Sequence, residues 1–122
     1  MISPRGSKKI YVDWLGTEIL LILNKTQLKH FVDDNKIESE DFNIDSWDSF
    51  DGYAGFAVRD SIPYYYMILN KYRGGTVAHE SVHLSEYILR NKGIKPKGET
   101  LAYMVAHIYE QTIKHLINKE KK

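Results

Sequence analysis

The segment His79-Glu80-Ser81-Val82-His83 constrains the fold of this chain more than any other stretch. Residues four apart share one face of an α-helix, one turn above the other, so a helix here aims both imidazoles at a single metal ion. Glu80 points roughly a quarter-turn away and is better placed to contact a water on that ion than to bind the ion itself. Catalytic zinc sites combine three protein ligands with an open position in this way. The competing interpretation is that these histidines lie at the surface or in the core without a metal.

The residues around the motif favour a helix. Gly74-Gly75 is typical of a turn that opens a helix, and Gly93 is suited to the position that ends one. Apolar residues recur between them with helical spacing: Val77, Ala78, Val82, Leu84, Ile88 and Leu89. We therefore predict that a helix from about Gly75 to Arg90 carries the site.

Two histidines do not hold zinc tightly, so the site needs a third ligand. The candidates that follow are Glu86, Glu99, His107, Glu110 and His115. Glu86 shares the face of His83, but three ligands on one straight helix diverge along its axis. Glu99 begins the next predicted helix after a short loop, and an antiparallel return would bring its carboxylate back to the histidines. We predict Glu99 as the third ligand and keep His107 as the alternative.

Composition narrows the kinds of protein that the chain can be. Its 122 residues suggest one domain, covering residues 1–122 with flexible ends at 1–8 and 118–122. It has no cysteine, which excludes disulfides and cysteine-based zinc sites, so a transition metal must rest on histidines and carboxylates. The net charge of +1 gives no reason to expect a nucleic-acid or membrane partner. No signal-type or membrane-length apolar run is seen, so we predict a cytoplasmic protein.

The remaining patterns predict an α+β fold. Segments rich in β-branched and aromatic residues are expected to be strands: Ile10–Leu15, Gly52–Arg59 and Tyr64–Leu69. The apolar run Glu18–Leu23 fits either a strand or a buried helix. A short helix is expected over Thr26–Asp34, capped by Asn24 or Thr26, and a last helix over Glu99–Asn118. We expect a small antiparallel or mixed sheet of about three to four strands packed on the motif helix and an antiparallel C-terminal helix.

The segment from Asp33 to Asp51 is strongly acidic. It fits a cation site or a recognition loop for basic peptides, but it also fits a solvated loop. We favour the solvated loop because the spacing of calcium-binding EF-hand loops is missing. Four apolar side chains are expected to tie this segment to the core: Phe42, Ile44, Trp47 and Phe50.

The motif and its surroundings resemble the zincin metallopeptidases, specifically the gluzincin type, in which a glutamate on the following helix completes the His-Glu-x-x-His site. The matching residues are His79, Glu80, His83 and Glu99. The segment from Glu99 to Tyr103 is similar to the Glu-x-x-Ala-Tyr segment of short, often phage-encoded, proteins with this motif. A bias toward Lys, Ile, Asn and Tyr likewise hints at a low-GC bacterium or its phage. The resemblance covers about Thr76 to Glu110, and the short gap between His83 and Glu99 indicates a minimal version.

The resemblance implies a zinc-dependent hydrolase that acts on a peptide or protein substrate. Zinc would lower the pKa of its water and polarise the substrate carbonyl, and Glu80 would act as general base and then acid. Tyr103 would donate a hydrogen bond to the developing oxyanion, unless it is only a packed helix residue. An edge strand, Gly52–Arg59, would bind an extended peptide by strand addition.

A different class of function is a non-catalytic, metal-stabilised binding or regulatory protein. A metal can stabilise a domain whose core is small, so the length of the chain permits this alternative. Glu80 favours catalysis, because a purely structural site does not need a carboxylate at that position.

Overall fold

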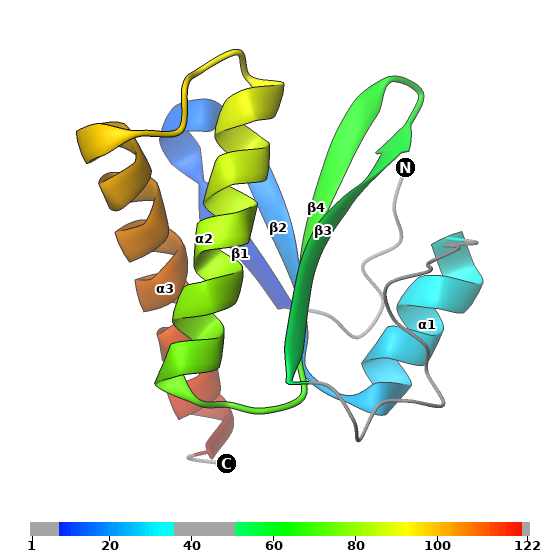
Figure 1. The fold of residues 1–122 in the computed structure, drawn as a ribbon. Helices are drawn as coiled ribbons and strands as arrows, with labels where there is room; N and C mark the ends of the chain where they lie inside the picture. The colour runs from blue at the N-terminus through cyan, green and yellow to red at the C-terminus, as the bar shows by residue number, and fades with distance from the viewer. Residues whose placement is uncertain (1–7, 36–50, 121–122) are drawn as a thin grey trace.

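The computed structural model describes residues 8–35 and 51–120. In chain order, the elements are β1 (Lys8–Val12), a 3-10 turn (Asp13–Leu15), β2 (Thr17–Ile22), α1 (Lys25–Asn35), β3 (Gly52–Arg59), β4 (Ile62–Leu69), α2 (Gly74–Asn91) and α3 (Gly98–Glu120). The sheet lies between α1 on one face and the pair α2 and α3 on the other (Figure 1). The α+β prediction is confirmed. The predicted contacts of Phe42, Ile44, Trp47 and Phe50 lie outside the described residues.

The sheet is mixed, with strand order β1-β2-β4-β3. β2 pairs with β4 in parallel, whereas the two outer pairs are antiparallel. The run Glu18–Leu23 is therefore mostly strand, in β2. Its apolar residues are continuous because a central strand is covered on both faces. β3 has the predicted bounds and lies at one edge of the sheet, next to α2.

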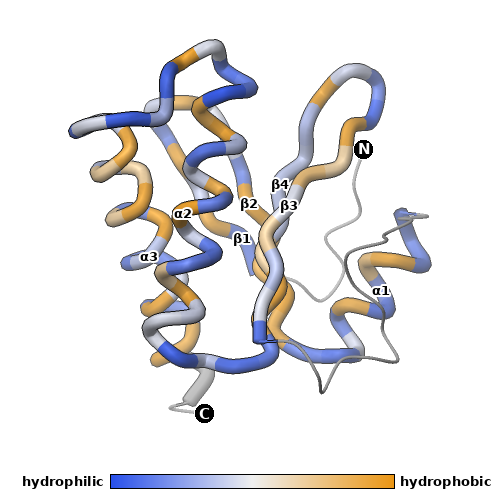
Figure 2. The backbone as a smooth tube through the Cα atoms, viewed as in Figure 1, coloured by the Kyte–Doolittle hydropathy of each residue, from blue (hydrophilic) through white to orange (hydrophobic). Residues whose placement is uncertain are grey.

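Alternate residues of the central strands fill two separate cores. Ile19 and Leu21 of β2 belong to the core under α2 and α3, whereas Leu20 and Ile22 belong to the core under α1. The hydropathy colouring in Figure 2 shows the apolar run of β2 between the two helical layers. The fold thus has a packed interior on both sides of the sheet, and that interior does not depend on the candidate metal site.

Local signals in the sequence set several boundaries. The Asn24 side chain accepts a hydrogen bond of 2.9 Å from the Gln27 N–H, so Asn24 caps α1 as predicted. Gly93 has φ +75°, and the Ile94 N–H donates to the Leu89 carbonyl at 2.9 Å. This hydrogen bond closes a Schellman motif, which confirms Gly93 as the residue that ends α2.

Two strand boundaries differ from the prediction. β1 ends at Val12 because Asp13–Leu15 forms a 3-10 turn, which Gly16 ends with φ +58°. The β3–β4 turn needs only Asp60 and Ser61, which both have positive φ, as in two-residue hairpin loops. β4 therefore begins at Ile62, two residues before the predicted start. No helix in the part of the chain that the structure describes is long and apolar enough to cross a membrane.

Candidate metal centre

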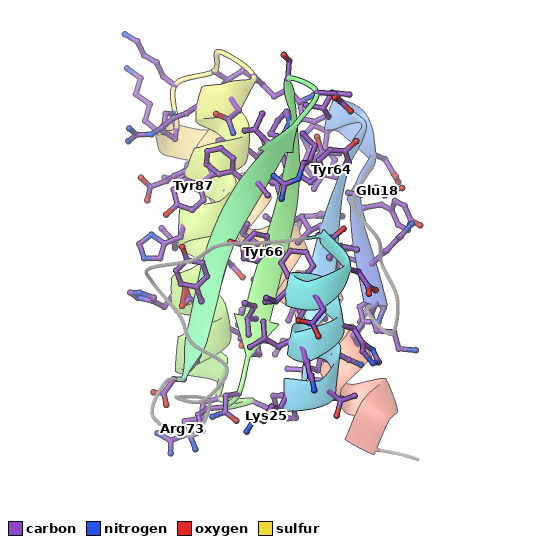
Figure 3. All side chains as sticks on the ribbon, turned by 90° about the vertical axis from the view of Figure 1, so that its right-hand side faces the viewer. Glu18, Lys25, Tyr64, Tyr66, Arg73 and Tyr87 are labelled. Carbon is purple, nitrogen blue, oxygen red and sulfur yellow. The ribbon has the colours of Figure 1, made fainter. Side chains whose placement is uncertain are left out.

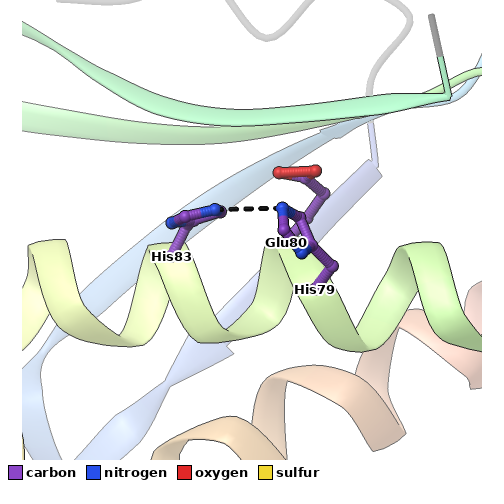
Figure 4. A group of neighbouring side chains, drawn as sticks. All are labelled: His79, Glu80 and His83. Carbon is purple, nitrogen blue, oxygen red and sulfur yellow. Dashed lines mark hydrogen bonds between the residues drawn. The ribbon is translucent and has the colours of Figure 1, made fainter.

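His79, Glu80 and His83 form one group on α2, with their ligand atoms within 4.8 Å of one another. The three side chains point toward the β3–β4 hairpin, whereas α3 lies on the other side of α2 (Figure 4). The Nε2 atoms of His79 and His83 are 3.1 Å apart. Two nitrogen ligands of a tetrahedral zinc ion lie about 3.3 Å apart when each Zn–N distance is about 2.0–2.1 Å. The imidazoles are thus spaced as ligands of one ion, and both are accessible to solvent.

The group lies at the border of the buried face of α2, because Leu84 follows Glu80 by one turn and is part of the core. Leu84 and Ile88 are fully buried against the sheet. Ser81 and Ser85 are also fully buried, and each hydroxyl donates 2.7 Å to the carbonyl four residues earlier on the same helix. These small side chains satisfy their own hydrogen bonds, so α2 packs closely on the sheet without leaving a buried polar group unpaired.

Glu80 is the buried member of the group, with 6% of its surface exposed. Its side chain lies against the start of β3, where a Cβ added to Gly52 would come within 3.2 Å of the Glu80 Cγ. Burial raises the pKa of the Glu80 carboxyl, and the charges of His79 and His83 oppose that rise. A carboxylate with a raised pKa is a more effective general base near neutral pH.

Gly52→Ala is expected to reduce the free energy of unfolding by about 1–3 kcal/mol, as overpacking does. The new methyl group would lie 3.0 Å from the Thr76 Cγ2 and 3.2 Å from the Ile68 carbonyl oxygen, as well as close to Glu80. Urea denaturation of both proteins measures the difference.

Gly75→Ala is the matched control, because nothing lies within 4 Å of a Cβ added there. Gly75 is inside α2, so alanine is expected to leave stability unchanged or raise it by up to about 1 kcal/mol. Equal stability of the two variants would contradict the close packing of Gly52 against Glu80 and Thr76.

The structure does not bring Glu99 to the histidines. Glu99 is exposed in the first turn of α3 and is not part of the group of ligand atoms. α3 runs antiparallel to α2 (Figure 1), so Glu99 follows the end of α2. His83 lies eight residues before that end, about 12 Å along the axis at 1.5 Å per residue. The antiparallel packing of α3 on α2 was predicted correctly, but the short loop places Glu99 at the C-terminal end of α2, beyond His83.

Two other predicted residues on α3 are also outside the group. Tyr103 is 69% exposed. The Nε2–H of His107 donates to the Tyr11 carbonyl at 2.6 Å, and its ring meets Trp14 edge-on with centroids 4.8 Å apart. His107 thus ties α3 to β1, and His115 does the same through the Lys9 carbonyl at 3.1 Å.

Two aromatic residues beside the group were not predicted from the sequence. The Tyr87 ring lies nearly parallel to that of His83, with centroids 6.3 Å apart and an interplanar angle of 19°. Phe56 of β3 contacts Tyr87 with centroids 5.5 Å apart. The spacing of four residues from His79 to His83 to Tyr87 was a signal for Tyr87. No sequence signal indicated Phe56, because its contact with Tyr87 depends on the docking of β3 on α2.

The group provides two imidazoles spaced for one ion and a buried carboxylate next to them. Among residues 8–35 and 51–120, no histidine, aspartate or glutamate other than Glu80 joins the two imidazoles as a third ligand. No protein-family model, no curated protein and no solved structure matches the chain. The structural support for the zincin resemblance is therefore the group of His79, Glu80 and His83 itself.

Proposed function

We propose that this protein is a zinc-dependent hydrolase of peptide bonds. The observation that carries the proposal is the 3.1 Å separation of the His79 and His83 Nε2 atoms, with the buried Glu80 beside them. His79 and His83 would hold the ion. When bound there, zinc supplies a water of lowered pKa and a Lewis acid for the substrate carbonyl.

The residues of the chain have separate roles in this proposal. Glu80 takes a proton from the attacking water and delivers it to the leaving amine. Its raised pKa suits both transfers, because the group must accept a proton and then release it. Glu99 was predicted as the third ligand, but the geometry of the described residues does not support that role.

The edge strand β3 is the proposed site for the substrate backbone. It borders the group through Gly52, and among residues 8–35 and 51–120 it pairs with β4 alone. Its outer edge would offer backbone hydrogen bonds to an extended peptide that lies next to Glu80 and the histidines.

The arrangement favours this role over that of a structural metal. A structural ion stabilises a small domain by linking separate segments, but His79 and His83 come from one helix. The two apolar cores include residues from every strand, so strands and helices are already held together by apolar contacts. An ion at this position would add little to the assembly of the fold.

Removal of the metal is expected to leave the protein folded. A bound ion stabilises the native state by mass action, by about 2.7 kcal/mol at 100 times its Kd, so Tm should fall by several degrees on chelation. The far-UV circular dichroism spectrum and the cooperative melting transition should remain. A chelated protein with the spectrum of an unfolded chain would instead support the structural role.

The proposal is tested by metal content and peptide cleavage measured together. Elemental analysis is expected to find about one zinc ion per chain. Mass spectrometry of a mixture of unstructured peptides should then reveal new termini, which disappear on chelation and return with added zinc. Zinc-loaded protein that leaves every peptide in a broad mixture intact would contradict a general peptidase.

A further inference from the structure

The face of β3 that looks toward α2 changes from small to large side chains along the strand. Alternate residues of a strand share a face, and here they are Gly52, Ala54, Phe56 and Val58. Gly52 lies against Glu80, and Ala54 is buried in the core under α2. Phe56 and Val58 are 38% and 53% exposed. This face of β3 therefore passes from closely packed small residues beside Glu80 to an exposed apolar surface at Phe56 and Val58.

Two aromatic rings from different elements form that surface. The Phe56 ring contacts Tyr87 at 5.5 Å and is supported from β4 by Tyr65 at 5.8 Å between centroids. Tyr87 lies on α2 (Figure 3). Its ring is nearly parallel to that of His83. The fold therefore holds the Phe56 and Tyr87 rings in place. Tyr87 stacks beside His83, a proposed metal ligand, and the two aromatic rings remain accessible to solvent.

We propose that Phe56 and Tyr87 bind a bulky apolar side chain of the substrate, aromatic or leucine-like, and so select the peptides that enter the site. The inference rests on the proposed function for the identity of the ligand as a peptide. An aromatic side chain stacks favourably on such rings, and burial of its apolar surface adds to the affinity.

The geometry of the strand gives the distance of this side chain from the reacting bond. Glu80 is level with Gly52, and Tyr87 is level with Phe56. At about 3.3 Å per residue, Phe56 is about 13 Å from Gly52, with the histidines between the two levels. A peptide paired along β3 therefore places the selected residue about two to four positions from the bond beside the metal group.

Peptide binding tests the inference without hydrolysis. Zinc-loaded Glu80→Gln protein is titrated into two fluorescent, blocked octapeptides of alanine, serine and glycine that differ by one central residue, Phe or Ala. We expect the Phe peptide to bind about tenfold more tightly, which corresponds to about 1.4 kcal/mol. Adding Phe56→Ala should reduce this ratio to about twofold or less, and Phe56→Leu should preserve part of it.

Ile117→Ala is the matched control, because Ile117 is also an exposed apolar residue, 45% exposed, but lies on α3. It should leave the ratio of the two affinities unchanged, and melting curves confirm that each variant is folded. Equal affinity for the two peptides, or a ratio that Phe56→Ala does not change, overturns the inference.

Failure of this inference can be distinguished from failure of the proposed function. If wild-type protein cleaves no peptide but the Phe56-dependent ratio is present, the hydrolase proposal fails and the binding site remains. If wild-type protein cleaves peptides and the ratio is absent, the hydrolase proposal stands without this selectivity.

Discussion

Glu80→Gln is expected to lower the rate of peptide hydrolysis by about 10²–10⁴-fold, the usual contribution of a general base. Glutamine has nearly the same shape, so it should occupy the same space beside Gly52 but accept no proton. Zinc should remain, because His79 and His83 are unchanged. The measurements are kcat/KM for a cleaved peptide and the zinc content of the same sample.

The pH dependence of the wild-type rate tests the same assignment. A general base acts when it is deprotonated, so kcat/KM should rise as pH increases through the pKa of Glu80. Burial raises that pKa in the metal-free protein, whereas the charge of a bound zinc ion would lower it. A rate that stays constant from neutral to strongly acidic pH would contradict the role of Glu80.

The stability of the metal-free protein provides a second check. A carboxyl whose pKa is raised on folding binds its proton more tightly in the folded state, so its contribution to stability is present at low pH. That contribution is lost as pH rises through the folded-state pKa. Glutamine does not ionise, so Glu80→Gln avoids this loss of stability. The variant should be at least as stable as the wild type at neutral pH.

Glu86→Gln is the control for these measurements. Glu86 lies on the same helix but pairs with Arg90 at 3.5 Å at the surface. Exposed pairs of this kind contribute little to stability, so neither the rate nor the melting temperature should change appreciably. Comparable loss of activity in both variants would mean that the effect comes from charge on α2 and not from a base at Glu80.

His83→Ala is expected to abolish stoichiometric zinc binding and, with it, hydrolysis. Two imidazoles 3.1 Å apart act as a pair, and a single remaining histidine on an exposed helix face is a weak site. Loss of a residue that only supports a ligand costs about 10–100-fold in metal affinity, so loss of a ligand should exceed that range. Zinc titration against a competing chelator measures the affinity. His79→Ala should lose zinc binding and hydrolysis in the same way.

Glu99→Ala and His107→Ala distinguish the structure from the sequence-based prediction of the third ligand. Glu99 is exposed at the start of α3, and His107 donates to the Tyr11 carbonyl. Both variants should therefore retain zinc with wild-type affinity. Loss of zinc in Glu99→Ala would show that Glu99 is the third ligand and that α3 approaches the histidines differently.

The sequence alone predicted the features that depend on interactions between neighbouring residues. The spacing of His79 and His83 requires only one turn of helix to bring the imidazoles together, and the structure places them on α2 as predicted. Asn24 and Gly93 set helix ends through hydrogen bonds and backbone angles within a few residues. The strand Gly52–Arg59 was likewise predicted with its bounds.

The tertiary structure decided every feature that joins distant segments. The run Glu18–Leu23 became a central strand because it pairs in parallel with β4, and no local pattern separates a buried strand from a buried helix. The separation of Glu99 from His83 and the contact of Phe56 with Tyr87 depend on how α3 and β3 dock on α2. The physical reason is the range of the interactions: helical periodicity and capping act over a few residues, whereas docking depends on the packing of the whole core.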